Sequence, residues 1–178
     1  SLSYEEMNTL AAGAPIGADH LTLLPFGNGV ERILQNVPLG AHLLGLDLLK
    51  HDQQHILRAA QEGIVSASPY GFRIMKDMGM DLNTVKAGHA NMFLSPIFRE
   101  TFVQMNQVNL ELYDTDGAQG AARGAGIGAG IFSTEEEAFH GLTLLQTLAP
   151  DPTGADRYEE TYQYWLSRLE QMRQPLTT

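Results

Sequence analysis

Residues 86–130 constrain the fold more than any other part of the chain, because strand-like and helix-like segments alternate there. Lys86–Gly88 has the character of a short strand tip, and Gly88–Asn91 that of a tight turn. The pair Ser95–Pro96 is typical of a helix start, with serine as N-cap and proline as first helical residue. Apolar residues then alternate as in a strand with one buried face, at Val108, Leu110 and Leu112. This order predicts an α/β layer architecture.

The N-terminal part adds a helix and a strand. Ser3 and Glu6 have the spacing of a capping box, which predicts a helix over residues 4–12. Residues 21–26 are expected to form a buried strand, with a turn at residues 27–29.

The middle part predicts one more strand and a long helical stretch. A second extended segment contains residues 43–44, between two glycines. Apolar residues recur at helical spacing from His51 to Met78. Pro69 lies inside this run and is expected to kink the helix or divide it, because proline lacks an amide proton and crowds the preceding turn.

Three further helices are predicted towards the C-terminus. The first covers residues 116–128, and the second starts at Ser133 with Glu136 as its capping-box partner. The third places an aromatic and apolar stripe on one face, which indicates core packing rather than a ligand site: Tyr158, Tyr162, Trp165, Leu166 and Leu169.

Composition narrows the class of protein. A chain of 178 residues fits one compact domain, over residues 1–178. It holds 21 acidic and 11 basic residues, a net charge of −10, which argues against a nucleic-acid partner. The longest apolar run is too short to cross a bilayer, so no membrane association is expected. The absence of cysteine rules out disulfides and thiolate metal sites and is compatible with the cytoplasm, where we expect the protein to act.

Several polar or glycine-rich motifs have an ordinary structural interpretation beside a functional one. The glycine run of residues 120–130 lacks the lysine of a phosphate loop, and we interpret it as a small-residue helix packed tightly on a neighbour. His51 and His55 nearly match a zinc motif but lack its glutamate, which favours a solvated helix start. Asp114 and Asp116 have the chemistry to hold Mg²⁺ through water, but helix capping is the preferred interpretation. No metal ligand is predicted.

Two interpretations stay open for the adjacent residues Glu31 and Arg32. Glu31 and Arg32 either order a loop at the mouth of a cleft or form a structural salt bridge.

The turn after the predicted strand at residue 88 is the strongest candidate for a ligand site. A turn of small residues between a strand end and a helix start leaves backbone amides free to face a ligand. His89 either contacts a bound ligand or is an ordinary loop residue. Asn91 carries an amide that both donates and accepts, which suits the polar edge of a nucleotide base; alternatively, it closes the turn by bonding its own backbone.

Several stretches in order resemble the C-terminal part of the FGGY carbohydrate kinase family, most closely its xylulose kinases. These stretches are LTLLPFGNGVER, GAHLLGLDLLKHDQQHILRAAQEGIV, GHANMFLSPIFRE, DTDGAQGAARGAG and DPTGADRYEETYQYWLSRL, and together they cover about residues 21–169. The resemblance implies part of an actin-like ATPase (ribonuclease H-like) domain, with a mixed sheet flanked by helices. It also implies ATP-dependent phosphorylation of a ketose, D-xylulose to D-xylulose 5-phosphate, with Mg²⁺ bound mainly through the nucleotide and the other lobe.

The resemblance also identifies an adenine-nucleotide shelf. Its residues are Ala87, Gly88, His89, Ala90, Asn91, Ala118 and Gly120. The family usually has Gly-Gly-Gly-Ala at the turn where this chain has residues 87–91. Arg32 is a further candidate for a cleft-facing residue.

No segment of the chain resembles the family's catalytic aspartate, so no catalytic residue is assigned. We expect a fragment that is inactive alone, with residues 1–2 as a vector scar and the sugar bound by the N-terminal lobe of the parent enzyme. A homodimer is expected where the cut exposes apolar surface. Two alternatives stay open: a kinase for another sugar or polyol of the same family, and a non-catalytic actin-like domain that binds nucleotide or regulates a partner.

Overall fold

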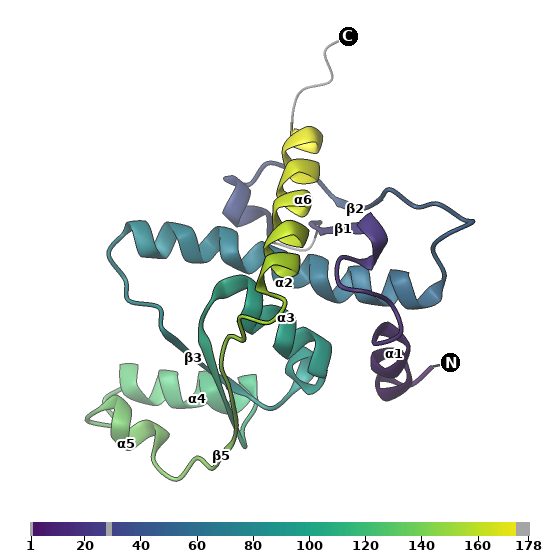
Figure 1. Cartoon of the computed structure of the whole chain (residues 1–178). Coiled ribbons are helices and arrows are strands. Elements are labelled where there is room, and N and C mark those ends of the chain that lie inside the picture. The colour runs from purple at the N-terminus through teal and green to yellow at the C-terminus, as the bar shows by residue number, and fades with distance from the viewer. Residues whose placement is uncertain (1, 28–29, 174–178) are drawn as a thin grey trace.

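The computed structural model describes residues 2–27 and 30–173 and consists of two small sheets connected by helices (Figure 1). The α-helices are α1 (Tyr4–Ala11), α2 (Gln53–Asp77), α3 (Pro96–Asn106), α4 (Gly117–Gly128), α5 (Glu135–Phe139) and α6 (Ala155–Arg173). The strands are β1 (Thr22–Pro25), β2 (Ala41–Leu44), β3 (Thr84–Gly88), β4 (Asn109–Tyr113) and β5 (Leu144–Leu148). Three short 3₁₀ turns are η1 (Ala18–His20), η2 (Val30–Leu34) and η3 (Asn91–Leu94).

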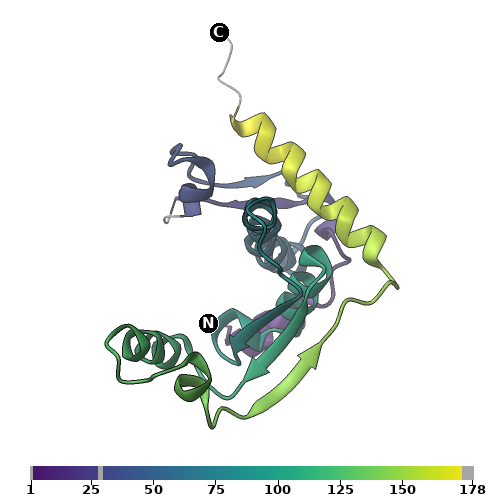
Figure 2. The same ribbon diagram turned by 90° about the vertical axis from the view of Figure 1, so that its left-hand side faces the viewer.

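The second sheet is mixed, as predicted. β1 and β2 form an antiparallel pair, whereas β3 and β4 run parallel and β5 joins β4 antiparallel. The parallel pair is connected by α3, which crosses back over the sheet before β4 begins. Figure 2 shows α2 between the β1–β2 pair and α3, with the three-stranded sheet beyond α3. The molecule is therefore a layered α/β structure.

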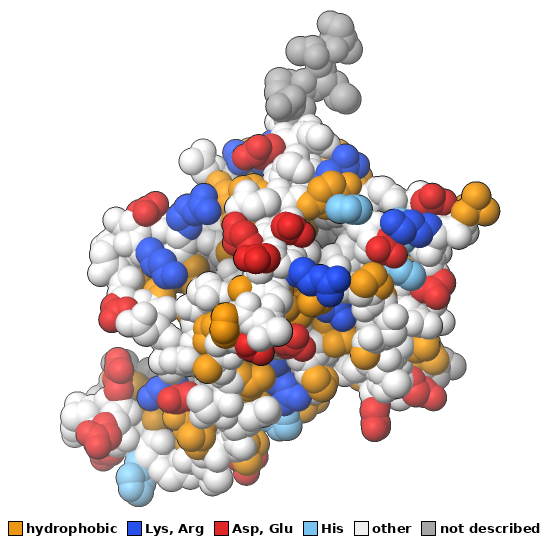
Figure 3. Space-filling model, viewed as in Figure 1, with side chains coloured by type: hydrophobic (Ala, Val, Ile, Leu, Met, Phe, Trp, Pro, Cys, Tyr) orange, Lys and Arg blue, Asp and Glu red, His pale blue; other side chains and the backbone are white. Residues whose placement is uncertain are grey.

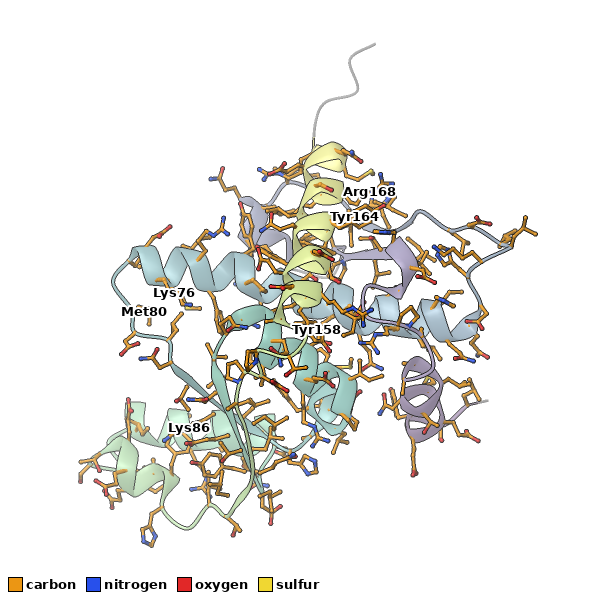
Figure 4. All side chains as sticks on the ribbon, in the orientation of Figure 1. Lys76, Met80, Lys86, Tyr158, Tyr164 and Arg168 are labelled. Carbon is orange, nitrogen blue, oxygen red and sulfur yellow. The ribbon has the colours of Figure 1, made fainter. Side chains whose placement is uncertain are left out.

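The main hydrophobic core connects these layers. Its buried residues come from β1, η2, α2, α3, β4 and α6. The predicted stripe on α6 is confirmed, because Tyr158, Tyr162, Trp165 and Leu169 are buried and Leu166 packs against the same core. Trp165 also donates its Nε1 proton to the backbone oxygen of Leu23 at 2.9 Å, which fixes α6 against β1. In Figure 4 the labelled Tyr158, Tyr164 and Arg168 lie along α6.

Of the two outcomes expected at Pro69, a kink or a division of the long helix, the division is wrong. α2 runs without interruption from Gln53 to Asp77. Proline at position 69 removes the amide that would bond the backbone oxygen of Val65. The hydroxyl of Ser68 donates to that oxygen at 2.7 Å instead, so the gap in the helical hydrogen bonds is filled by a side chain.

The helix starts follow the sequence closely, with one correction. The capping box of α1 is present, and Ser95 and Asp116 cap α3 and α4. For α5 the predicted pair is displaced by one residue: Thr134 is the N-cap, and the backbone N–H of Ser133 donates to Glu137 at 2.7 Å. The strand β5 was not predicted. The turn predicted at residues 27–29 lies mostly outside the described residues, as does the side chain of Glu31.

The tight packing predicted for the glycine run is wrong for most of α4. A Cβ added at Gly120, Gly124 or Gly128 would meet nothing within 4 Å. Gly126 is the exception, because it is buried and a Cβ there would collide with the ring of Phe132. The small side chains of α4 therefore leave most of its surface open.

Candidate functional site

The two predicted ligand-facing segments meet at the carboxyl ends of β3 and β4. Gly88 pairs with Tyr113 at the last position of the parallel register, and the backbone N–H of His89 donates to the oxygen of Tyr113 at 2.9 Å. α3 starts a few residues after β3, and α4 starts shortly after β4. The carboxyl ends of parallel strands, followed by helix starts, are where α/β sheets usually bind ligands.

Gly88 has a packing reason to be glycine. A Cβ at this position would collide with the backbone oxygen of Thr115 and lie 2.9 Å from its carbonyl carbon. The loop after β3 and the loop after β4 are therefore in close backbone contact. This contact brings Gly88 next to Asp116, the N-cap of α4, whose first turn carries Ala118 and Gly120. Ala118 is exposed, whereas Ala87, Ala90 and Gly120 are half-buried.

Asn91 does not close its own turn through its side chain. Backbone bonds do so: Ala90 N–H donates to Gly88 oxygen at 2.8 Å, and Phe93 N–H donates to Ala90 oxygen at 3.1 Å. Asn91 has a φ of 52°, a left-handed conformation that asparagine tolerates better than most residues. Its side chain is exposed, and its amide bonds to no other residue in the described part of the chain. The amide is therefore free to face a ligand.

His89 contacts a residue that the sequence did not indicate. Its Nε2 lies 3.2 Å from Nη1 of Arg99 on α3, and the same Nη1 donates to Oε1 of Gln146 on β5 at 3.1 Å. Burial lowers the pKa of Arg99 below its usual value. No sequence motif marks Arg99 or Gln146, because their proximity depends on how α3 crosses the sheet. Gln146 lies on the strand that was not predicted.

The acidic and histidine motifs have structural roles. Asp116 accepts from the backbone N–H of Gln119 at 2.9 Å and so caps α4, which supports the preferred interpretation. His51 is buried rather than solvated: its Nδ1 accepts from the Asp47 N–H at 3.0 Å, and its Nε2 lies 3.2 Å from the Asp19 oxygen. Among the described residues, no group of three or more side chains is arranged to hold a metal.

One cavity lies beside the segment that follows the candidate turn. It measures about 640 Å³ between α1 and the segment where η3 leads into α3, and its surface is mainly apolar. Leu94, the last residue of the η3 turn that begins at Asn91, lines it. The other lining residues are Tyr4, Glu5, Asn8, Thr9, Ala12, Pro96 and Ile97.

A second, smaller cavity of about 180 Å³ lies away from this edge. It is lined by residues 16, 17 and 19–23 together with residues of α2 and α6. None of the predicted shelf residues lines either of these two cavities.

The charged side chains do not gather into a single patch on the face shown in Figure 3, where acidic and basic groups are interspersed with hydrophobic ones. Within the described ranges, no helix is both long and apolar enough to cross a membrane.

The fold is similar to that of solved sugar kinases. A crystal structure of xylulose kinase from Rhodospirillum rubrum superposes with a TM-score of 0.75 at 23% identity, over 95% of this chain and 34% of that one. Plasmodium falciparum glycerol kinase with ADP superposes with a TM-score of 0.70 at 17% identity, over 98% of this chain and 35% of that one. The predicted fold class is confirmed by these similarities.

Curated relatives point to the same class. A xylulose kinase of Haemophilus influenzae is 28% identical over 180 residues, which cover 97% of this chain. An L-xylulose/3-keto-L-gulonate kinase of Escherichia coli is 27% identical over 167 residues, or 91% of this chain. The chain spans 35% and 32% of the length of these two relatives. No family model matches the chain.

Proposed function

We propose that this chain supplies the adenine-nucleotide side of a carbohydrate kinase that transfers phosphate from ATP to a ketose, with D-xylulose as the substrate. The supporting observation is the carboxyl edge of β3 and β4, where Gly88 lies against the loop that leads into α4 and Asn91, three residues further on, carries a free amide. The similarity to xylulose kinases over 97% of the chain supports the substrate class. Because the chain spans about a third of those relatives, we propose residues 1–178 as one nucleotide-side domain that is inactive alone.

The shelf of Ala87, Gly88, His89, Ala90, Asn91, Ala118 and Gly120 fits the adenosine part of ATP. An asparagine amide can donate to one acceptor of adenine and accept from its amino group. ATP supplies the phosphoryl group. The negative charge on this group during transfer is stabilised by positive charge and by backbone amides. Since the described residues offer no cluster of metal ligands, Mg²⁺ would be held mainly by the nucleotide and by parts outside this chain.

A kinase for another sugar or polyol is the second candidate. The Escherichia coli relative is named for L-xylulose and 3-keto-L-gulonate, and structural neighbours include gluconate and glycerol kinases.

A homodimer is also proposed, because apolar side chains such as Leu48 and Leu49 are largely exposed. Sedimentation velocity of the isolated chain would detect it, and a strictly monomeric chain at high concentration would contradict it.

ADP binding by saturation-transfer NMR tests the nucleotide site. We expect transfer to the adenine protons, and roughly tenfold weaker binding in Asn91→Asp, because the variant loses a donor and adds a negative charge. Asn36→Asp is the matched control, since Asn36 is also an exposed asparagine with a left-handed φ, of 62°. Gly88→Val is unsuitable as a binding variant, because the valine side chain would collide with the Thr115 backbone and disturb the fold itself.

A folded chain that shows no transfer would contradict the proposed function. Equal loss of binding in the Asn36 and Asn91 variants would contradict the placement of the adenine at Asn91.

A further inference from the structure

The contact between Arg99 and His89 determines where the histidine carries its proton. A guanidinium group donates hydrogen bonds and has no acceptor. Nη1 of Arg99 lies 3.2 Å from Nε2 of His89, so Nε2 must be the acceptor in this hydrogen bond. An imidazole whose Nε2 accepts is neutral and carries its proton on Nδ1. The geometry therefore selects one of the two neutral tautomers.

The arginine is held in place by more than this one contact. Nη1 also donates to Oε1 of Gln146 at 3.1 Å, so the guanidinium bridges the loop after β3 and the strand β5. Its Nε is buried and has no partner among the described residues. None of the ion pairs found in those residues includes Arg99. Arg99 is thus a partly buried cation without a carboxylate, at an edge where an anionic ligand is proposed.

The opposite side of the imidazole is open. His89 is exposed, and in the described part of the chain no group accepts a hydrogen bond from its Nδ1. A residue held through one nitrogen and free at the other presents a single, oriented donor.

We propose that Arg99 is a positioning residue that fixes His89 as the Nδ1–H tautomer, so that the loop after β3 presents one N–H donor to an acceptor atom of a bound nucleotide. The proposal rests on the nucleotide function proposed above. It identifies Arg99 and Gln146, which carry no sequence signal, as the support for a residue that touches the ligand.

The tautomer is measured without any ligand. Long-range ¹H–¹⁵N NMR of the histidine side chains distinguishes Nδ1–H from Nε2–H, and His89→Asn assigns the signals of His89. In the unaltered chain we expect the Nδ1–H pattern. In Arg99→Met, where nothing donates to Nε2, we expect the Nε2–H form to become the major one. An Nε2–H pattern in the unaltered chain, or an unchanged tautomer in Arg99→Met, would overturn the proposal.

ADP titration then tests the purpose of this arrangement. Arg99→Met and His89→Ala should each weaken ADP binding by roughly fivefold, the loss expected for about one hydrogen bond. The double variant should bind no more weakly than His89→Ala, because both changes remove the same contact. Arg99→Lys should restore part of the affinity and of the Nδ1–H population, since lysine also donates. Lys76→Met removes a cation near the end of α2 (Figure 4) and should leave both readouts unchanged.

The two proposals fail in different ways. If the unaltered chain binds no ADP, the proposed function is contradicted, while the tautomer still decides whether Arg99 positions His89. If ADP binds and the tautomer changes as expected but affinity does not, the donor role of His89 towards the nucleotide is overturned.

Discussion

The surroundings of Glu62 and the carboxyl edge of β3 and β4 differ in how their polar groups are satisfied. Glu62, on α2, is 3% exposed, yet its carboxylate accepts from Arg58 Nε at 2.7 Å and from the Gly17 N–H at 3.1 Å. At the edge, Thr115 Oγ1 and Arg99 Nε are buried without a partner among the described residues, and the Asn91 amide is free. The first region is complete within this chain. The second has bonding capacity that a ligand could use.

The glycines repeat this difference. On α2, a Cβ at Gly63 would collide with the Leu23 backbone, because helix and strand are in direct contact there. On α4, next to the edge, a Cβ at Gly124 would meet nothing within 4 Å. Glycine therefore allows close packing in one region and leaves open surface in the other. The same residue type therefore has two different structural roles, and only the structure distinguishes them.

The largest expected effect comes from breaking the buried ion pair. Arg58→Met leaves the Glu62 carboxylate buried without its cation, and we expect it to lower the free energy of unfolding by about 3–5 kcal/mol. Burial already raises the pKa of Glu62, and loss of Arg58 should raise it further. A carboxyl group whose pKa is higher in the folded state than in the unfolded state stabilises the fold at a pH below the unfolded-state pKa. This stabilisation is lost as the pH rises through the folded-state pKa. The destabilisation should therefore be larger at pH 8 than at pH 5, as measured by urea unfolding.

Lys50→Met is the control for this change, because Lys50 is an exposed cation whose nearest carboxylate, on Asp19, is 3.9 Å away. It should cost at most about 1 kcal/mol. If both variants lost the same free energy of unfolding, the buried Arg58–Glu62 pair would contribute no more to stability than an exposed ion pair does.

A matched pair of glycine substitutions tests the second contrast. Gly63→Ala should destabilise the chain by about 1–3 kcal/mol, because α2 and β1 must separate to admit the methyl group. Gly124→Ala should stabilise it by about 0.5–1 kcal/mol, because alanine is the better helix former and has room. Thermal unfolding of both variants gives the comparison directly. A loss in Gly124→Ala would show that α4 is more closely packed than the structure indicates.

Much of the fold was predictable because it depends on local chemistry. Capping residues such as Ser3 and Ser95, and the alternation at Leu110 and Leu112, act over a few residues and appear in the structure as expected. β5 was missed because residues 144–148 are mostly exposed and lack an alternating pattern. The sequence left open whether Pro69 kinks or divides the long helix. The division does not occur, and the hydroxyl of Ser68 bonds the backbone oxygen that lost its amide donor.

The candidate site was predictable only in part. The turn after β3 and the start of α4 carry local signals, and the structure brings both to one edge. The reason for glycine at position 88 was not visible, since it depends on the backbone of Thr115. Arg99 and Gln146 could not be found either, because their partners are set by helix crossing rather than by spacing. The binding role of the shelf residues remains a prediction.

The smallest expected effect compares two hydroxyl groups. Ser66 is buried on α2, and its hydroxyl donates to the Glu62 backbone oxygen at 2.8 Å, so Ser66→Ala should cost about 1 kcal/mol. Thr115→Val replaces a buried hydroxyl that has no partner in the described residues with a methyl group of similar size. It should leave the free energy of unfolding within about 0.5 kcal/mol of the unaltered chain, since no hydrogen bond is lost. If Thr115→Val lost as much free energy of unfolding as Ser66→Ala, the Thr115 hydroxyl would already have a hydrogen-bond partner in solution. The polar groups at the edge would then be as fully hydrogen-bonded as those around Glu62.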